Sequence, residues 1–205
     1  MKLYGFSATR SLRALWGLKE LGLDFDYVPV DLLKGEHRTP DFLKINPAGK
    51  VPVLIDGDLV LPESAAIILY LAEKHPESGL IPTDLAVRAE MYRWIMFSVT
   101  ELEQPLWRIT KHSFLLPEER RSPAEIQLAR EDYTAMAAVL DRHMEGRSFL
   151  VGDRITAADC VTAWLMDWAN ENDLMEGFPN LQAYMQRLYG RPTAPPRIAE
   201  ARKAA

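Results

Sequence analysis

The chain has 205 residues with 24 Lys or Arg against 29 Asp or Glu, and this mildly acidic balance gives no general attraction to nucleic acid or to an anionic membrane. Cys160 is the only cysteine, which excludes an internal disulfide and a cysteine-rich zinc site, and no apolar run approaches the roughly 20 residues that span a bilayer. We therefore expect a soluble cytoplasmic protein, complete in this form, with room for one large domain or two small ones.

The first 75 residues alternate short strand-like runs with helical patterns, which is typical of an α/β unit. A tight hairpin is expected around Asp56-Gly57, because Asp-Gly is a preferred two-residue turn. The predicted elements, in chain order, are a strand at 2–6, a helix at 11–21, a strand at 25–30, a helix at 40–46, strands at 51–55 and 59–61, and a helix at 64–75.

The second half of the chain has helical periodicity throughout. Two prolines and a glycine in residues 76–86 interrupt the periodic segments and indicate a linker. We therefore place a first domain at 1–77, a linker at 78–86 and an all-helical domain at 87–205. The tail from Pro192 is expected to be loosely held. Helices are predicted over 88–107, 123–145, 157–170 and 180–189.

Three hydroxyl residues, Ser7, Thr9 and Ser11, gather where the first helix begins. Ser and Thr side chains commonly cap helices by accepting hydrogen bonds from the first free backbone N–H groups. Alternatively, the helix N-terminus holds an anion and a hydroxyl points at it. The stretch by itself leaves both interpretations open.

A proline lies inside the run Val51-Pro52-Val53-Leu54-Ile55, which otherwise reads as a strand. Proline cannot donate to a strand ladder, so an edge position or a bulge is expected, and the bond before it is a candidate for the cis form. Val51 can then offer its backbone N–H and C=O to an extended, peptide-like ligand. The alternative is an edge strand protected against aggregation.

Glu63 and Ser64 stand at the start of the helix predicted over 64–75. Ser64 suits an ordinary N-cap, and Glu63 suits a solvated charge that the helix dipole favours. In a functional interpretation, Ser64 and the free N–H groups behind it bind a carboxylate, while Glu63 receives an ammonium. Together they would recognise the end of an α-amino acid.

These features, in their order and spacing, resemble a cytosolic glutathione transferase over nearly the whole chain. The stretches that carry the resemblance are NPAGKVPVL, LPESAAIILYL and FLVGDRITAADC. The resemblance implies a thioredoxin-like α/β domain that binds glutathione and an all-α domain that supplies most of the pocket for a small hydrophobic electrophile. It also implies glutathione as co-substrate with no metal, a role in detoxification, and a homodimer in which both domains contribute to the interface.

The same resemblance assigns parts of the glutathione molecule to residues. It implies that Val51, beside Pro52, pairs with the cysteinyl backbone, and that Glu63 and Ser64 hold the γ-glutamyl end. The glycine carboxylate is assigned to polar or basic side chains that match positions used by many members: His37, Arg38 and Lys50, of which Lys50 is preferred.

Glutathione brings its own thiol, so the chain needs only a group that stabilises the thiolate. Comparison with serine-type members places Thr9 at the catalytic serine, with Ser11 second and Ser7 third. Comparison with cysteine-type bacterial members places Arg10 at the cysteine, so the chain departs from that class. We therefore expect a bacterial member of the serine or threonine type.

The alternatives to a conjugating transferase are of two kinds. One is a glutathione-dependent isomerase, lyase, dehalogenase or reductase on the same fold, which differs in the second-domain pocket. The other is a non-catalytic interaction protein. The presence of Val51-Pro52, Glu63-Ser64 and a hydroxyl at the helix start argues against the second kind.

Overall fold

The computed structural model describes residues 1–203 and divides by internal contacts into two units. Unit 1 contains residues 1–81 together with the chain from Tyr189 onward, and unit 2 contains residues 82–188. The domain boundaries expected from sequence, 1–77, 78–86 and 87–205, gave the C-terminal segment to the helical domain. The grouping by contacts differs because that segment is held by side chains of unit 1.

Unit 1 is built on a four-stranded mixed sheet with the order β2-β1-β3-β4. The central strand β1 is parallel to β2 and antiparallel to β3, and β3 and β4 form an antiparallel hairpin. That hairpin turns at Asp56-Gly57, as the sequence predicted. The strands are β1 (Lys2–Gly5), β2 (Asp26–Pro29), β3 (Val53–Asp56) and β4 (Leu59–Pro62).

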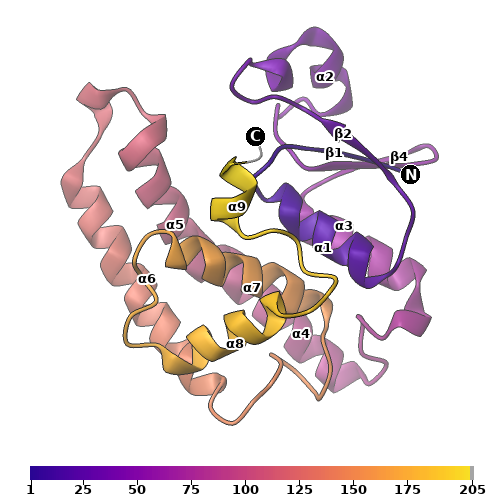
Figure 1. Ribbon diagram of the computed structural model, residues 1–205, viewed down its shortest axis with the longest axis vertical. Helices are drawn as coiled ribbons and strands as arrows, with labels where there is room; N and C mark the ends of the chain where they lie inside the picture. Colours follow the sequence, from indigo (N-terminus) through magenta and orange to yellow (C-terminus); the bar gives the residue numbers. More distant parts are fainter. Residues whose placement is uncertain (204–205) are drawn as a thin grey trace. The chain divides into compact units, whose positions relative to one another are not determined.

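Helices cover both faces of this sheet (Figure 1). On one face, buried apolar side chains of α1 and α3 pack on Leu3 and Leu54. On the other face, Phe42 of α2 packs on Val30 and Val53. The α/β architecture expected for the N-terminal half is thus confirmed. The helices of unit 1 are α1 (Ser11–Glu20), α2 (Pro40–Ile45), α3 (Ser64–Lys74) and α9 (Ile198–Lys203).

The close approach of α1 and α3 depends on a glycine in the middle of α1. A Cβ atom added to Gly17 would lie 3.1 Å from Cγ1 of Ile68, which is tighter than ordinary van der Waals contact. Four residues earlier on the same face of α1 lies Arg13, and four residues before Ile68 lies Ser64. The two helix faces that meet at Gly17 and Ile68 therefore also bring Arg13 and Ser64 together, one turn closer to the start of each helix.

Unit 2 is all-helical, as predicted, and α7 is its buried centre: every residue from Ala157 to Ala169 is buried. The long helical stretch predicted over 88–107 is continuous but contains a π-helical segment at 98–102, and a second π-helical segment lies beyond it at 111–115. No helix among residues 1–203 is long and apolar enough to cross a membrane. The α-helices are α4 (Leu85–Phe97), α5 (Glu103–Thr110), α6 (Pro123–His143), α7 (Ala157–Asn170) and α8 (Pro179–Tyr189).

The start of α7 is fixed by the buried carboxylate of Asp159. It accepts hydrogen bonds from the backbone N–H of Leu150 (2.9 Å), from the backbone N–H and hydroxyl of Thr156 (2.7 and 2.9 Å) and from the hydroxyl of Tyr184 (3.0 Å). Burial raises the pKa of Asp159 to about 6, although these donors favour the ionised form. A capping box is present at residues 156–159.

Replacing Asp159 by Ala is expected to lower the free energy of unfolding by about 2–4 kcal/mol, because several buried donors lose their acceptor together. Urea denaturation followed by circular dichroism measures this change. The matched control is Asp153→Ala, an exposed aspartate in the same segment, for which a change within about 0.5 kcal/mol is expected. Equal effects of the two substitutions would contradict the assigned role.

The C-terminal segment is anchored to α1 by a group of side chains that we term the Glu20 cluster: Glu20, Trp16, Arg191 and Thr193. The Glu20 side chain is 5% exposed. Nε and Nη2 of Arg191 donate to its two oxygens, each at 2.8 Å. Trp16 Nε1 donates at 3.2 Å, and the Thr193 hydroxyl also donates to it. The expectation of a loosely held tail from Pro192 is therefore wrong for the described residues, because the tail's polar side chains complete a buried ion pair.

The Glu20 cluster predicts a pH-dependent part of the stability. Burial by itself would raise the pKa of Glu20, but the hydrogen bonds from Arg191, Thr193 and Trp16 outweigh it and hold the pKa below its usual value. A lowered carboxylate pKa contributes stability above the unfolded-state pKa and loses it as the pH falls through the folded-state value. Glu20→Gln should therefore lower the free energy of unfolding by about 1–3 kcal/mol near pH 7.

The difference between wild type and Glu20→Gln should shrink steadily as the pH is lowered below about 4.5. Denaturant titrations of both proteins at a series of pH values measure it. Lys44→Ala is the control, since Lys44 forms an exposed ion pair with Asp41 in the same unit. A difference that stays constant with pH would show that the Glu20 charge does not stabilise the fold.

Candidate functional site

The register of the sheet brings the predicted site residues to one edge. Val53, the first residue of β3, pairs with Tyr4 of β1 on one side and with Pro62 of β4 on the other. Since β3 is antiparallel to both neighbours, its beginning lies beside the ends of β1 and β4. The chain before Val53, the turn after β1 and the start of α3 after β4 therefore lie at the same sheet edge.

The turn after β1 holds a chain of hydrogen-bonded hydroxyls. Thr9 Oγ1 lies 2.7 Å from the carbonyl oxygen of Phe6 and 2.9 Å from Oγ of Ser11, and a hydroxyl has one proton to donate. The backbone N–H of Ser11 donates to Thr9 Oγ1 at 3.2 Å, and the N–H of Phe6 donates to Ser11 Oγ at 3.2 Å. Thr9 thus accepts a bond from the first N–H of α1, and its single proton lies within donating distance of the Phe6 carbonyl and of Ser11 Oγ.

The two hydroxyls differ in accessibility. Ser11 is 1% exposed and packs against Gly5, where a Cβ atom would lie 2.9 Å from that of Ser11. Thr9 is half-buried. Ser11 does not cap α1: the N-cap residue is Arg10, and the Ser11 hydroxyl accepts the N–H of Phe6, just after β1. Of the three hydroxyl residues, Thr9 and Ser7 keep exposed surface at this turn.

Val51 and Pro52 are joined by a cis peptide bond, as the sequence suggested. Pro52 precedes β3, which begins at Val53 and lies between β1 and β4. The expected edge strand is therefore wrong: the sheet tolerates the proline because it stands before the ladder. Within the described part of the chain, no hydrogen bond engages the backbone N–H or C=O of Val51. Both groups are thus available for a ligand with an extended backbone.

The start of α3 carries a backbone conformation that L-residues rarely adopt. Glu63 has φ of 72° and ψ of 111° and is the N-cap residue, without a side-chain capping bond. Ser64 is the first helical residue rather than the expected N-cap, and it is 4% exposed. Its hydroxyl accepts a hydrogen bond from Nη1 of Arg13 at 3.4 Å. The carboxylate of Glu63 is exposed at the site edge.

Arg13 is a site residue that the sequence analysis did not single out. It is 1% exposed and brings a guanidinium of α1 to the N-terminus of α3. A positive charge there adds to the partial charge of the helix end and favours a bound carboxylate. Its signal in the sequence was an arginine four residues before a glycine, on the face of α1 that packs on α3.

The loops that carry the predicted basic residues approach each other closely. A Cβ atom on Gly49 would lie 2.9 Å from the carbonyl oxygen of His37, and Gly49 has φ of 59°. Asn46 shapes this loop by donating from Nδ2 to the carbonyl of Lys50 at 2.8 Å. Nδ1 of His37 is buried and has no hydrogen-bond partner among the described residues. His37 and Lys50 therefore belong to neighbouring loops, with Arg38 beside them.

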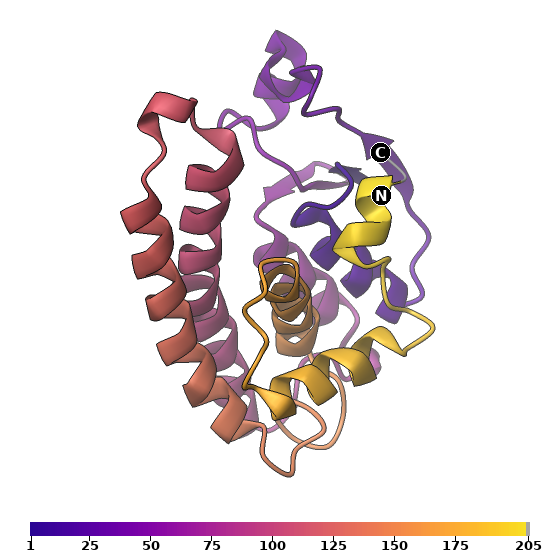
Figure 2. The same cartoon turned by 60° about the vertical axis from the view of Figure 1, so that its left-hand side comes forward.

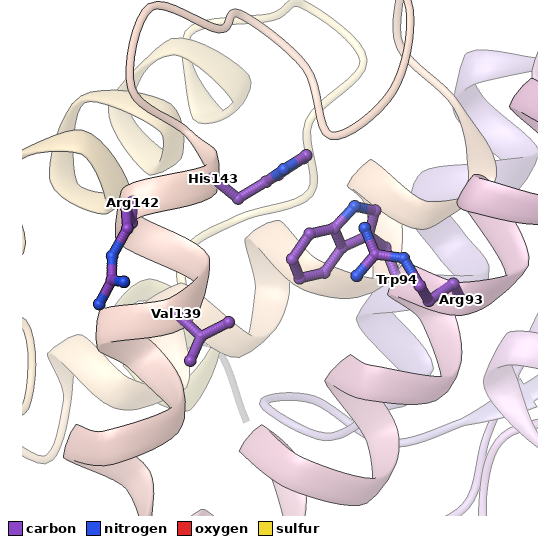
Figure 3. Close-up of a pocket in the computed structure, with 5 residues that line it drawn as sticks. All are labelled: Arg93, Trp94, Val139, Arg142 and His143. Atoms are coloured by element: carbon purple, nitrogen blue, oxygen red, sulfur yellow. The ribbon is translucent and has the colours of Figure 1, made fainter.

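Unit 2 contains a separate pocket of about 330 Å³ between α4 and the end of α6. Figure 3 shows Val139 and His143 pointing across it toward Trp94. Arg93 stacks over the Trp94 ring at 4.0 Å, and His143 lies 4.2 Å from it. Burial, followed by the charges of nearby arginines, lowers the pKa of His143, so its imidazole is neutral near pH 7. None of the predicted site residues lines this pocket.

A second pocket of unit 2, of about 280 Å³, includes Glu101 in its lining. Its lining is mixed, with Pro105, Ala135 and Met136 beside polar residues, and Arg108 is held by Glu125 (3.1 Å) and Asp132. Among residues 1–203, no three His, Cys, Asp or Glu side chains are grouped so that they could hold a metal ion. The polar constellation at the edge of the unit 1 sheet is therefore the strongest candidate site.

The sequence matches two family models in chain order. Residues 1–73 match the glutathione S-transferase N-terminal domain, and residues 105–192 match the glutathione S-transferase C-terminal domain. The chain belongs to the cytosolic glutathione S-transferase family. The family and the fold class predicted from the sequence are both confirmed.

Named relatives agree with this family. Glutathione S-transferase 1 of Dianthus caryophyllus is 40% identical over 166 residues, which cover 80% of this chain and 74% of the relative. A zeta-class glutathione S-transferase of Euphorbia esula is 39% identical over 163 residues, 78% of this chain and 71% of the relative. Glutathione transferase F7 of Populus trichocarpa superposes with a TM-score of 0.86 at 27% identity, covering 98% of each chain.

The predicted assignment of the chain as a glutathione S-transferase enzyme is thus confirmed. These named relatives are plant proteins, so the narrower expectation of a bacterial, serine- or threonine-type enzyme stays a prediction. The family uses glutathione as a substrate. Residue roles toward glutathione in this glutathione S-transferase are treated below as a proposal.

The backbone of Glu63 gives a prediction about stability in this glutathione S-transferase. Non-glycine residues at positive φ cost about 1–2 kcal/mol, which glycine avoids. Glu63→Gly should raise the free energy of unfolding by about 1 kcal/mol, after the added freedom of the unfolded chain is counted. Glu63→Gln keeps the strain and should leave stability within about 0.5 kcal/mol. Parallel urea titrations compare them, and a destabilised glycine variant would contradict the assigned strain.

Proposed function

We propose that this glutathione S-transferase binds glutathione along the sheet edge before β3 and stabilises its thiolate with the Thr9 hydroxyl. The thiolate then attacks a small hydrophobic electrophile. The observation that carries the proposal is the bonding of Thr9 Oγ1: it accepts the first N–H of α1, and its one proton, which lies toward the Phe6 carbonyl, would turn to a bound sulfur atom.

The backbone of Val51 is proposed to pair with the cysteinyl residue of glutathione. Its unengaged N–H and C=O, next to the cis bond to Pro52, support this role. Because Val51 stands at the same sheet edge as the turn after β1, a ligand paired with it would have its sulfur near Thr9.

Glu63 and Ser64 are proposed to hold the γ-glutamyl end. The exposed carboxylate of Glu63 suits the ammonium, while Ser64, the free N–H groups of α3 and the buried guanidinium of Arg13 suit the carboxylate. At the other end of the tripeptide, Lys50 and His37 are proposed to bind the glycine carboxylate. The exposure of Lys50 and the close approach of the two loops support that pairing.

The energetics need no metal and no general base. A free thiol has a pKa of about 8.5, and lowering this pKa to about 6.5 requires that the thiolate be stabilised by about 2.7 kcal/mol. A hydrogen bond to a charged group contributes about 1.5–3 kcal/mol, and a helix N-terminus adds about 0.3–1 kcal/mol. Thr9 and α1 together are therefore sufficient to make the bound thiol mostly ionised near pH 7.

The roles of the two predicted catalytic hydroxyls then differ. Thr9 would donate to the sulfur, giving up its bond to the Phe6 carbonyl. Ser11, being 1% exposed, would support Thr9 by holding the end of β1 rather than touch the thiolate itself. In the reaction the thiol proton leaves to solvent, the sulfur forms a bond to the electrophilic carbon, and the displaced group leaves with the bonding electrons.

The electrophile site, the cellular location and the oligomeric state are proposed from the family resemblance. The electrophile is expected to bind with the help of the all-helical unit, in a cytoplasmic homodimer with a role in detoxification. Glutathione-dependent isomerisation, dehalogenation and reduction use the same thiolate. Aryl halides, enones, alkyl halides, peroxides and mixed disulfides, tested as a panel, distinguish these reactions from conjugation.

The Thr9 assignment is tested by titrating the ultraviolet absorbance of bound glutathione thiolate. Thr9→Ala should raise the pKa of the bound thiol by about 1 to 2, because one hydrogen bond to the charged sulfur is lost. Thr9→Ser keeps a hydroxyl and should remain near the wild type, and Ser11→Ala should have the smaller effect. A wild-type thiol pKa in Thr9→Ala would overturn the assignment, and absence of glutathione binding by calorimetry would overturn the proposed site.

A further inference from the structure

The larger cavity of unit 2 shares no residue with the proposed glutathione site. It has a volume of about 330 Å³, and we term it the Trp94 cavity. Figures 1 and 2 show α6 beside the continuous helical stretch that begins with α4. All lining residues belong to these two helices, which hold side chains more precisely than loops do. The lining residues are Arg93, Trp94, Val139, Arg142 and His143.

Trp94 places a buried donor in the wall of this cavity. The residue is 2% exposed, and its indole Nε1 is buried with no hydrogen-bond partner among the described residues. Figure 3 shows the indole nitrogen on the edge of the ring nearest to His143. A buried N–H without an acceptor is unfavourable and is rare in folded proteins. The Trp94 N–H therefore indicates an acceptor that binds in the cavity.

His143 places an acceptor near this donor. Its Nε2 lies 2.8 Å from the carbonyl oxygen of Leu150, and a carbonyl only accepts, so Nε2 carries the proton of the neutral ring. Nδ1 then holds a lone pair, and no group within residues 1–203 donates to it. The imidazole thus asks for a donor at the same place where the indole asks for an acceptor.

Arg93 gives the cavity a second donor and a positive charge. Its Nε and Nη2 donate to Glu90 at 3.0 and 2.6 Å, and in the described part of the chain Nη1 has no acceptor. The guanidinium lies 4.0 Å over the Trp94 ring, so Nη1 is close to the indole. Arg142 stands at the rim and points away from Trp94 in Figure 3, so it adds charge rather than a contact. Arginines therefore outnumber the single nearby carboxylate.

This set of groups discriminates between kinds of anion. Two N–H donors in positive surroundings favour an oxyanion, as they would in any anion site. The lone pair of His143 additionally requires that the bound oxyanion carry a proton. Carboxylate and sulfate groups only accept near neutral pH, whereas a phosphate group, whose second pKa is about 6, still offers an O–H. Phosphate therefore satisfies all three unpartnered atoms.

We propose that the Trp94 cavity is a binding site for a phosphate group, in which Trp94 and Arg93 donate to its oxygens and its O–H donates to His143. The phosphate is either the free ion or the end of a small phosphate monoester. The cavity has the volume of about ten waters in the liquid, which leaves room for the body of such an ester beside Val139. The site is independent of the proposed function of Thr9.

The experiment is calorimetric titration of the full chain at pH 7 without glutathione. The probes are inorganic phosphate, glycerol phosphate and sulfate, at constant ionic strength so that general charge screening is equal. Trp94→Phe keeps an aromatic ring but removes the N–H, and Arg93→Gln removes the charge. Trp164→Phe is the matched control, because Trp164 is also 2% exposed but belongs to α7 and does not line the cavity.

Wild type should bind inorganic phosphate or glycerol phosphate about tenfold or more tightly than sulfate, because sulfate has no O–H for His143. Trp94→Phe and Arg93→Gln should each weaken phosphate binding by about tenfold. Trp164→Phe should match wild type. The tighter of the two phosphate probes identifies the source of the group, since an ester that uses the cavity binds more tightly than the free ion.

A second measurement covers a variant with lowered stability. Each protein is melted with and without the phosphate probe and is compared with itself. The probe should raise the melting temperature of wild type and Trp164→Phe equally, and that of Trp94→Phe by much less. A merely structural role of Trp94 would lower the melting temperature but leave this rise intact.

Equal affinities for phosphate and sulfate would show a general anion-binding surface and overturn the proposal. Wild-type affinity for phosphate in Trp94→Phe, or no phosphate binding by wild type, would also overturn it. Failure of the proposed glutathione site gives a different result. It abolishes glutathione binding and leaves the phosphate titrations, which contain no glutathione, unchanged.

Discussion

The pairing of β3 with β1 and β4 determines which residues meet at the proposed glutathione site. Val53 lies between Tyr4 and Pro62, so the end of β1, the beginning of β3 and the end of β4 share one sheet edge. Two helices start from that edge, and each begins with backbone N–H groups that have no partner within the helix. A one-residue slip of β3 would turn Val53 to the other face and separate the features that the register now joins.

The polar residues at this edge show how two helix starts can be used differently. At α1, the hydroxyl of Thr9 accepts the first N–H of the helix and Ser11 is buried against Gly5. At α3, the N-cap is a strained Glu63 without a capping bond, and a buried arginine lies beside Ser64. The first start presents a hydroxyl proton, whereas the second presents open N–H groups and positive charge.

Much of this arrangement could be predicted from the sequence because local chemistry determines it. The Asp-Gly hairpin, the strand and helix order, the capping box of α7 and the cis bond before Pro52 each depend on a few adjacent residues. The errors concern the positions of elements relative to one another. Ser11 and Ser64 have the residue type of an N-cap, but each is the first residue inside its helix, which therefore begins one residue earlier than a serine cap would indicate. Pro52 was placed within a strand, whereas the strand begins at Val53. Arg191 could not be found from the sequence, since its partner is 171 positions away, and Arg13, whose partner is 51 positions away, was marked only by its spacing from Gly17.

The return of the C-terminal segment to unit 1 has a consequence for biosynthesis. A ribosome synthesises residues 1–81 long before Arg191. Trp16 therefore lacks Tyr189, and the Glu20 carboxylate lacks Arg191, until all of unit 2 has been synthesised. The segment that follows unit 2 along the chain thus completes the unit that precedes unit 2. Closure of the sheet-bearing unit must therefore follow the synthesis of unit 2, and a chain terminated before Tyr189 would lack the donors that Arg191 and Thr193 supply to the Glu20 carboxylate.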